Sequence, residues 1–232
     1  METHPVVALL LFATTGIAVG TALSAFRHST VFGRRAFGGA ELAIAVWAFT
    51  AFLELGVADL AARTTIAVVQ YLGIVSLPVF WLRFAGAYAH TIDPRSRWAA
   101  ALWLIPVATV AAAATNDSHH LLWSAVVREG TRPVDVVFRH GPLFWVNWGY
   151  AYVLLALSTW WLVRALVRLW PSERYRSQTW LLLGGMAIPW IANLVSVLGL
   201  LPNAGVDLTP VAFGVSGVCV VIGTARLRRA DT

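Results

Sequence analysis

Residues 37–58 read FGGAELAIAVWAFTAFLELGVA. A helix needs about 20 mostly apolar residues to cross a hydrocarbon core about 30 Å thick, and this stretch reaches that length. Its only ionisable side chains are Glu41 and Glu54. Charged groups inside a membrane are costly and by default indicate function. The stretch therefore predicts a transmembrane helix with two carboxylates that need an explanation.

The composition of the whole chain extends this prediction. The 232 residues are 59% apolar and 12% charged, with a mean hydropathy of +0.71. Soluble domains are about 45–50% apolar and about 25% charged. We therefore expect an all-α membrane protein, a seven-transmembrane helix bundle that forms a single domain over residues 1–232. Its spans are predicted at residues 6–26, 37–58, 65–89, 98–115, 142–164, 179–201 and 208–225.

The reactive residue types exclude several classes of protein. All 17 basic residues are arginine, and lysine is absent. This excludes a retinal-binding pump, which needs a lysine Schiff base, and a phosphate-binding loop with its lysine. The single cysteine, Cys219, excludes a disulfide within the chain. Because no nucleophile–base pair stands out either, we expect no enzyme activity and no cofactor.

The arginines also predict the orientation of the helices, because positive residues collect in short cytoplasmic loops. Only Arg63, Arg128, Arg132 and Arg139 fall on the side of the N-terminus. The opposite side, after the first, third, fifth and seventh spans, holds twelve arginines: Arg27, Arg34, Arg35, Arg95, Arg97, Arg164, Arg168, Arg174, Arg176, Arg226, Arg228 and Arg229. We expect a multi-pass protein of the cell's inner (plasma) membrane with the N-terminus outside and the C-terminus in the cytoplasm. The net charge of +6 is then a signal of topology, and no nucleic-acid partner is expected.

Three charged side chains lie inside predicted spans. Glu41 and Arg83 are expected at the same depth near the cytoplasmic side, where they would form a structural ion pair or extend separately to the interface. Glu54 lies about 6 Å below the outer end of its helix, at a rise of about 1.5 Å per residue. The two acids are too far apart along the helix to act as a catalytic pair, so Glu54 is the better candidate for ligand binding.

Other spans carry polar groups to the depth of Glu54, which favours a ligand cavity open to the outside. Glu54 and Asn193 would be its polar anchors, with aromatic walls. The alternative is that these groups satisfy one another as hydrogen bonds between helices. The predicted ligand-binding residues are Trp47, Glu54, Gln70, Tyr71, Asn147, Tyr150 and Asn193.

The longest loop, at residues 116–141, is expected on the outer side. We predict a short amphipathic helix around residues 119–127 that lies on the bundle as a cap. The loop holds His119, His120 and His140 near Asp117. These residue types can bind metal, but their spacing is not diagnostic, and no metal site is expected.

A series of motifs runs in order along the chain and resembles the N-terminal seven-transmembrane sensor region of bacterial and archaeal histidine kinases. Each motif is weak alone, and the order and spacing make the resemblance specific. They are Trp47 with Glu54; Tyr71, Gly73, Pro78, Phe84 and Tyr88; Pro106; Thr115-Asn116; His120 to Trp123; Arg139 to Pro142 with Phe144, Trp145 and Tyr150; Pro189 to Asn193; Gly199, Pro202, Asp207 to Pro210 and Phe213.

The resemblance implies a membrane sensor of a two-component system that binds a small molecule outside and passes a helix movement through its last helix. Its partners would be the ligand, membrane lipid, a cytoplasmic signalling protein or output domain, and a second copy of the chain. The kinase region that follows this module in the family is not among these residues, so kinase activity is not implied. The chain would be either a stand-alone homologue or the sensor part of a longer protein. The alternative to a sensor is a small-solute transporter or channel. A third possibility is a structural or assembly subunit.

Overall fold

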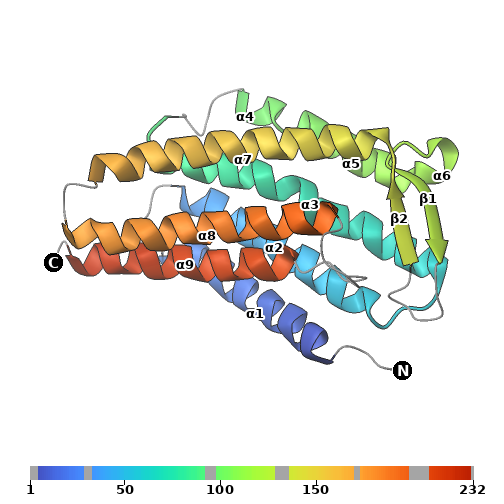
Figure 1. Cartoon of the computed structure of the whole chain (residues 1–232), viewed down its shortest axis with the longest axis horizontal. Helices are drawn as coiled ribbons and strands as arrows, with labels where there is room; N and C mark the ends of the chain where they lie inside the picture. Colours follow the sequence, from blue (N-terminus) through green and yellow to red (C-terminus); the bar gives the residue numbers. More distant parts are fainter. Residues whose placement is uncertain are drawn as a thin grey trace.

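A computed structural model describes residues 5–28, 33–91, 98–128, 136–169, 173–198 and 209–230 (Figure 1). It is mostly helical, as predicted, and a helix lies at each predicted span, the fourth being divided in two. The elements are α1 (Pro5–His28), α2 (Arg34–Glu54), α3 (Leu60–Tyr88), α4 (Trp98–Ala101), α5 (Leu104–Ala114), α6 (Asn116–His119), β1 (Trp123–Arg128), β2 (Val136–His140), α7 (Pro142–Leu169), α8 (Glu173–Val197) and α9 (Thr209–Ala230).

Three helices are long and apolar enough to cross a membrane, counting only the part of the chain that the structure describes: Pro5–Arg27, Arg34–Glu54 and Leu60–Tyr88. The outer face of α1 exposes the large apolar side chains of Val6, Leu9 and Phe12. A contiguous apolar face of this kind favours contact with lipid or with another protein over contact with water.

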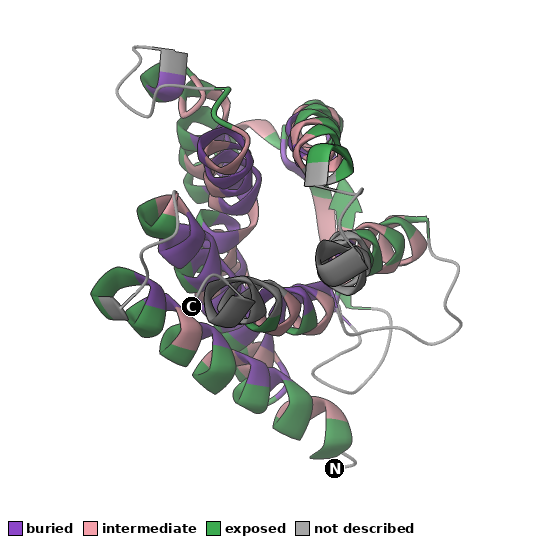
Figure 2. Cartoon of the chain, turned by 90° about the vertical axis from the view of Figure 1, so that its left-hand side faces the viewer, coloured by how far each residue is buried: buried purple, intermediate pink, exposed green. Residues whose placement is uncertain are grey.

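The long helices run alternately in opposite directions (Figure 1). As a result α1 begins at the end of the bundle that carries β1 and β2, and α9 ends at the opposite end. Helix α2 packs between α1 and α3, α9 packs against α1, α2 and α8, and α7 packs on α3. Seen along the bundle (Figure 2), α1 is exposed over most of its surface, whereas α2 is largely buried.

Two close approaches at glycine fix how α2 packs. A Cβ atom added to Gly73 of α3 would collide with the carbonyl oxygen of Ala43 and lie 3.0 Å from the backbone nitrogen of Trp47. A Cβ atom added to Gly217 of α9 would collide with the carboxylate of Glu41. Only a glycine allows α3 to pass the α2 backbone at this distance, whereas at Gly217 the end of the Glu41 side chain would have to shift.

The fully buried Glu41 lies where α1, α2 and α9 meet. Its Oε2 atom accepts a hydrogen bond of 2.7 Å from the hydroxyl of Thr21 on α1, and Gly217 of α9 packs against the carboxylate. Together these contacts join the first two helices to the last. The ion pair expected between Glu41 and Arg83 is not one of these contacts and stays a prediction.

The prediction of a helix around residues 119–127 is wrong. Helix α6 ends at His119, and His120 has a positive φ of 53°, which stops the helix. Strand β1 then pairs antiparallel with β2, with Val126 opposite Phe138. The physical reason is the β-branched and aromatic content of both segments, which suits a half-buried pleated surface better than a helix. Trp123 and Val126 belong to a cluster that includes Tyr71 of α3, so the β1–β2 sheet lies on the bundle where a cap was expected.

Candidate functional site

A cavity of about 340 Å³ lies between the helices beneath the β1–β2 sheet. Its volume falls at the lower end of the range for small-molecule sites, about 300–1,000 Å³. It is lined by Trp47, Glu54, Arg63, Ala67, Gln70, Tyr71, Ile74, Leu77, Pro78, Trp123, Val136, Phe138, His140, Phe144, Asn147, Trp148, Ala151, Tyr152, Leu155, Pro189, Trp190, Asn193, Ser196, Val197 and Phe213.

Six of the seven predicted ligand-binding residues line this one cavity, although they come from four different helices. The exception is Tyr150. Its hydroxyl donates a hydrogen bond of 2.6 Å to the carbonyl of Leu102, between α4 and α5. Tyr152 lines the cavity in its place and donates a hydrogen bond of 3.0 Å to Oδ1 of Asn193. Residues that are two positions apart in a helix lie about 200° apart around its axis, so Tyr150 and Tyr152 face different neighbours.

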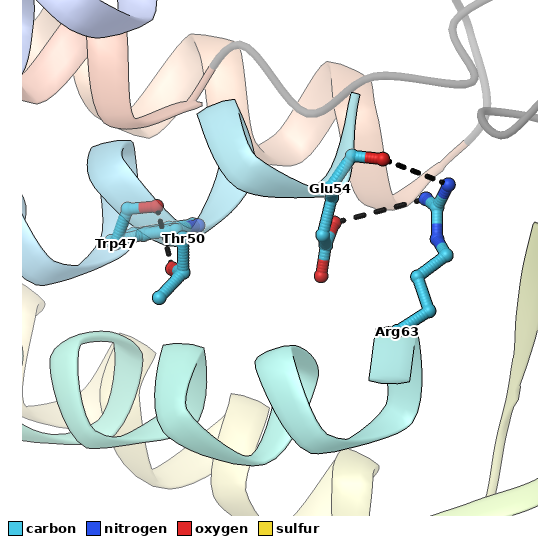
Figure 3. A network of polar contacts seen from close by, with 4 residues as sticks. All are labelled: Trp47, Thr50, Glu54 and Arg63. Atoms are coloured by element: carbon cyan, nitrogen blue, oxygen red, sulfur yellow. Dashed lines mark hydrogen bonds and ion pairs between the residues drawn. The ribbon is translucent and has the colours of Figure 1, made fainter. Parts of the chain in front are cut away.

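Glu54 is paired with Arg63, a residue that the sequence analysis assigned to a loop. The Nη2 atom of Arg63 lies 3.8 Å from Oε2 of Glu54. Nη1 of Arg63 donates a hydrogen bond of 3.3 Å to the backbone carbonyl of Glu54 (Figure 3). The two side chains are 4% and 15% exposed, so this is a buried pair. Its members hold each other in place at the edge of the cavity.

The start of α3 explains why Arg63 reaches Glu54. Asp59 caps the helix by accepting a hydrogen bond of 2.7 Å from the backbone N–H of Ala62. Helix α3 therefore begins at Leu60, earlier than the predicted start at residue 65, and Arg63 falls in its first turn. An acid nine residues before an arginine, with an Asp cap between them, is the sequence signal that could have predicted the pair.

The α2 side of the cavity is built by one helix face. Trp47 and Glu54 are separated by about two turns, so both point to the same side of α2. Thr50 between them donates to the carbonyl oxygens of Val46 at 2.7 Å and Trp47 at 3.0 Å (Figure 3). Its hydroxyl is thus satisfied within α2, which leaves the indole and the carboxylate as the groups that α2 supplies to the cavity.

Aromatic side chains spaced four residues apart form the wall along α7. Phe144, Trp148 and Tyr152 all line the cavity, and His140 precedes them at the same spacing. The His140 ring stacks on Phe144 with centroids 3.5 Å apart and an interplanar angle of 1°. The rings of Trp148 and Tyr152 are 4.2 Å apart, and Tyr152 packs edge-on against Trp190 of α8 at 5.3 Å. This spacing places Phe144, Trp148 and Tyr152 on one face of α7, and the stack on Phe144 brings the His140 ring from β2 to the same wall.

The roof of the cavity is the β1–β2 sheet, and Asn116 fixes its position. Oδ1 of Asn116 accepts hydrogen bonds of 3.0 Å from the backbone N–H groups of Leu122 and Trp123. Its Nδ2 donates a hydrogen bond of 2.9 Å to the carbonyl of Trp123. The Trp123 ring then packs edge-on against Tyr71 at 5.5 Å. Asn116 is buried and positions Trp123, a role that the sequence analysis missed.

His119 of the long loop makes local hydrogen bonds. Nε2 of His119 lies 3.2 Å from the hydroxyl of Thr115, and its Nδ1 accepts a hydrogen bond of 3.0 Å from Leu121 N–H. Within the described ranges, no three His, Cys, Asp or Glu side chains are grouped to hold a metal ion.

The comparison with protein families found a match. A family model described as the N-terminal 7TM region of histidine kinase matches residues 10–232. The chain belongs to this family. The matched residues include every element that lines the cavity. The comparisons with curated proteins and with solved structures found no match to the chain.

Membership explains the helical architecture. The histidine-kinase seven-transmembrane region is a membrane sensor region, and the apolar helices α1, α2 and α3 fit that environment. Part of the motif set that carried the resemblance lines the cavity: Trp47, Glu54, Tyr71, Trp123, Phe144, Asn193 and Phe213.

One pH effect is expected in this sensor region. His140 lies at the edge of the cavity, and its burial against neighbouring groups lowers the pKa of its imidazole below the usual value of 6.5. A depressed pKa means that the folded state binds the proton less well than the unfolded chain. The contribution of the neutral ring to stability is therefore present above about pH 6.5 and is lost as the pH falls through the lower pKa of the folded state.

This effect is measured by NMR titration of the His140 ring in the folded protein. We expect a pKa below 6.5 in the wild type and a value closer to 6.5 in the Phe144→Ala variant, which uncovers one face of the imidazole. An unchanged pKa in that variant would show that the stacked ring is not what covers His140.

Proposed function

We propose that the chain is a multi-pass sensor of the inner (plasma) membrane that binds a small ligand in the cavity and signals through α9 to a cytoplasmic partner. The observation that carries the proposal is the cavity itself, which gathers Trp47, Glu54, Asn147 and Asn193 from α2, α7 and α8 beneath a fixed roof. Concave sites lined by aromatic groups with a few convergent polar groups are typical of small-molecule binding.

Orientation supports ligand access from outside. The predicted topology has seven spans with the arginine-poor side facing out. The β1–β2 sheet and the beginning of α1 lie together at one end of the bundle (Figure 1), so in this topology the cavity beneath the sheet lies in the outer half. The end of α9 lies at the opposite end, where a cytoplasmic partner would meet it.

A direct contact connects the cavity to α9. Phe213 of α9 lines the cavity and packs against Trp47 of α2, with ring centroids 5.9 Å apart. About one turn further along α9, Gly217 packs against Glu41. A ligand that moves the Trp47 or Phe213 ring therefore acts on the packing of the last helix. Such a ligand shifts the conformational equilibrium only if it binds one arrangement of α9 more tightly than the other.

The test uses the two polar anchors. Purified protein in lipid nanodiscs is screened for small compounds that raise its thermal unfolding temperature. The best compound is then titrated against Glu54→Gln and Asn193→Ala. Loss of a buried hydrogen bond to a ligand costs about 1–3 kcal/mol, so binding should weaken by about 5- to 150-fold.

Tyr150→Phe is the matched control. This tyrosine is on α7 like Tyr152, but it contacts Leu102 and does not line the cavity, so ligand affinity should stay within about twofold. Unchanged affinity in both anchor variants, with the fold intact, would rule out the cavity as the ligand site. Solute flux through proteoliposomes would favour a transporter instead.

A further inference from the structure

We propose that the ligand is an uncharged molecule with a flat conjugated ring and hydrogen-bonding groups at its edge. The inference rests on the proposed function, because it names the class of ligand for the same cavity. Three properties of the wall carry it: the kind of surface that it offers, the balance of its charges and the position of its amides.

The surface of the cavity is dominated by aromatic rings from several elements. The wall includes Trp47 of α2, Tyr71 of α3, Trp123 of β1 and Trp190 of α8. It also includes the α7 rings of Phe144, Trp148 and Tyr152. These rings also contact one another, as in the pairs Tyr71–Trp123 and Tyr152–Trp190. Aromatic pairs add about 0.5–1.5 kcal/mol to simple burial of apolar area, so such a wall favours a flat conjugated ring over an aliphatic molecule of equal size.

The charges of the cavity cancel. Among the described residues that line it, Glu54 and Arg63 pair with each other, and His140, the other titratable base, is neutral above its lowered pKa. An ionic ligand would either enter without a counter-ion or separate this buried pair. Both routes are costly, because an ion removed from water needs a partner and a broken pair leaves a buried charge. A neutral molecule has neither cost.

Polar recognition comes from amide side chains. Gln70, Asn147 and Asn193 line the cavity from α3, α7 and α8. The Oδ1 atom of Asn193 accepts the hydrogen bond from Tyr152, so its amide nitrogen is the group left to donate elsewhere. Amides provide both donors and acceptors without net charge. They suit a neutral ring that carries polar atoms at its edge.

The experiment compares probes that share the same fluorinated indole ring system and differ in charge. Fluorine NMR measures binding of 5-fluoroindole, which is neutral, 5-fluorotryptamine, a cation, 5-fluoroindole-3-acetate, an anion, and 5-fluorotryptophan, a zwitterion, to the full chain in nanodiscs. Empty nanodiscs correct for partition into lipid. We expect the neutral probe to bind at least tenfold more tightly than each of the others.

Two variants on α7 locate the binding. Trp148→Leu removes a ring from the cavity wall and should weaken 5-fluoroindole binding by about tenfold or more. Trp160→Leu is the matched control, because Trp160 is 58% exposed on the same helix; it should leave binding unchanged. Thermal unfolding shows whether each variant is folded. Should Trp148→Leu fail to fold, Gln70→Ala replaces it, with a several-fold weakening expected.

The outcomes separate the two proposals. If a charged probe or the zwitterion binds as tightly as 5-fluoroindole and Trp148→Leu weakens it, the ligand class is wrong while the cavity remains the ligand site. If no probe binds above the empty-nanodisc background, the ligand class is wrong as well. If the probes bind but a folded cavity variant has no effect on any of them, both the ligand class and the cavity as a binding site are overturned.

Discussion

Replacing Arg63 with methionine should destabilise the folded protein by about 3–5 kcal/mol, because it leaves the Glu54 carboxylate buried without its cation. The pair is almost fully enclosed, with the two side chains 4% and 15% exposed. The variant also loses the hydrogen bond from Arg63 to the Glu54 carbonyl at the end of α2. The measurement is the free energy of unfolding in mixed micelles titrated with sodium dodecyl sulfate.

Two further variants test the reason for that loss. The double variant Arg63→Met with Glu54→Gln should regain most of the stability, since replacing both members of a buried pair by uncharged groups is often close to neutral. Arg35→Met is the surface control, because Arg35 is exposed in the first turn of α2; it should change stability by no more than about 0.5 kcal/mol. A double variant as unstable as Arg63→Met would contradict the charge explanation.

Gly73→Ala is expected to cost about 1–3 kcal/mol, the usual effect of forcing extra atoms into a packed interior. The new methyl group would meet the carbonyl of Ala43 and the backbone nitrogen of Trp47. Backbone atoms of a helix cannot rotate away as a flexible side chain can, so α2 and α3 must separate. Because Trp47 lines the cavity, ligand binding should weaken together with stability.

The control for Gly73 is another helical glycine with free space around it. Gly149 on α7 has no heavy atom within 4 Å of an added Cβ. Gly149→Ala should leave stability unchanged or raise it by up to about 1 kcal/mol, because alanine favours the helix. The measurement is the free energy of unfolding of the Gly73→Ala and Gly149→Ala variants under the same conditions. Equal effects at the two positions would argue against the close approach of α2 and α3.

The helical framework could be predicted because apolar length alone marks a membrane helix. Within the described residues a helix lies at each of the seven predicted spans, and α3 begins at Leu60, before its predicted start at residue 65, because Asp59 caps it there. That all seven helices cross a membrane stays a prediction. The β1–β2 sheet was missed because a short run such as residues 123–128 fits either a helix or a strand by periodicity. Its pairing partner, β2, begins only at Val136, and the local pattern of residues 123–128 does not reveal that partner.

The cavity could be predicted to the extent that depth in the membrane places residues together. Glu54, Gln70 and Asn193 were grouped by depth, and they line one cavity. The predicted Tyr150 lies outside the cavity because Phe144, Trp148 and Tyr152 repeat every four residues along one face of α7, and Tyr150 does not belong to that series. Depth in the membrane therefore predicts the level of the cavity. The angular position of each residue around its helix axis is also needed to predict which side chains face the cavity.

The glycine at position 217 limits the ways in which α9 can move. It stands opposite the Glu41 carboxylate, where a single added carbon atom collides. A turn of α9 about its own axis would bring Ser216 or Val218 to that place, and either side chain would force the Glu41 carboxylate, which Thr21 also holds, to shift. Sliding or tilting by a small amount keeps the glycine in position. We therefore expect ligand binding to move α9 lengthwise or as a lever, with little rotation, as it carries a signal out of the bundle.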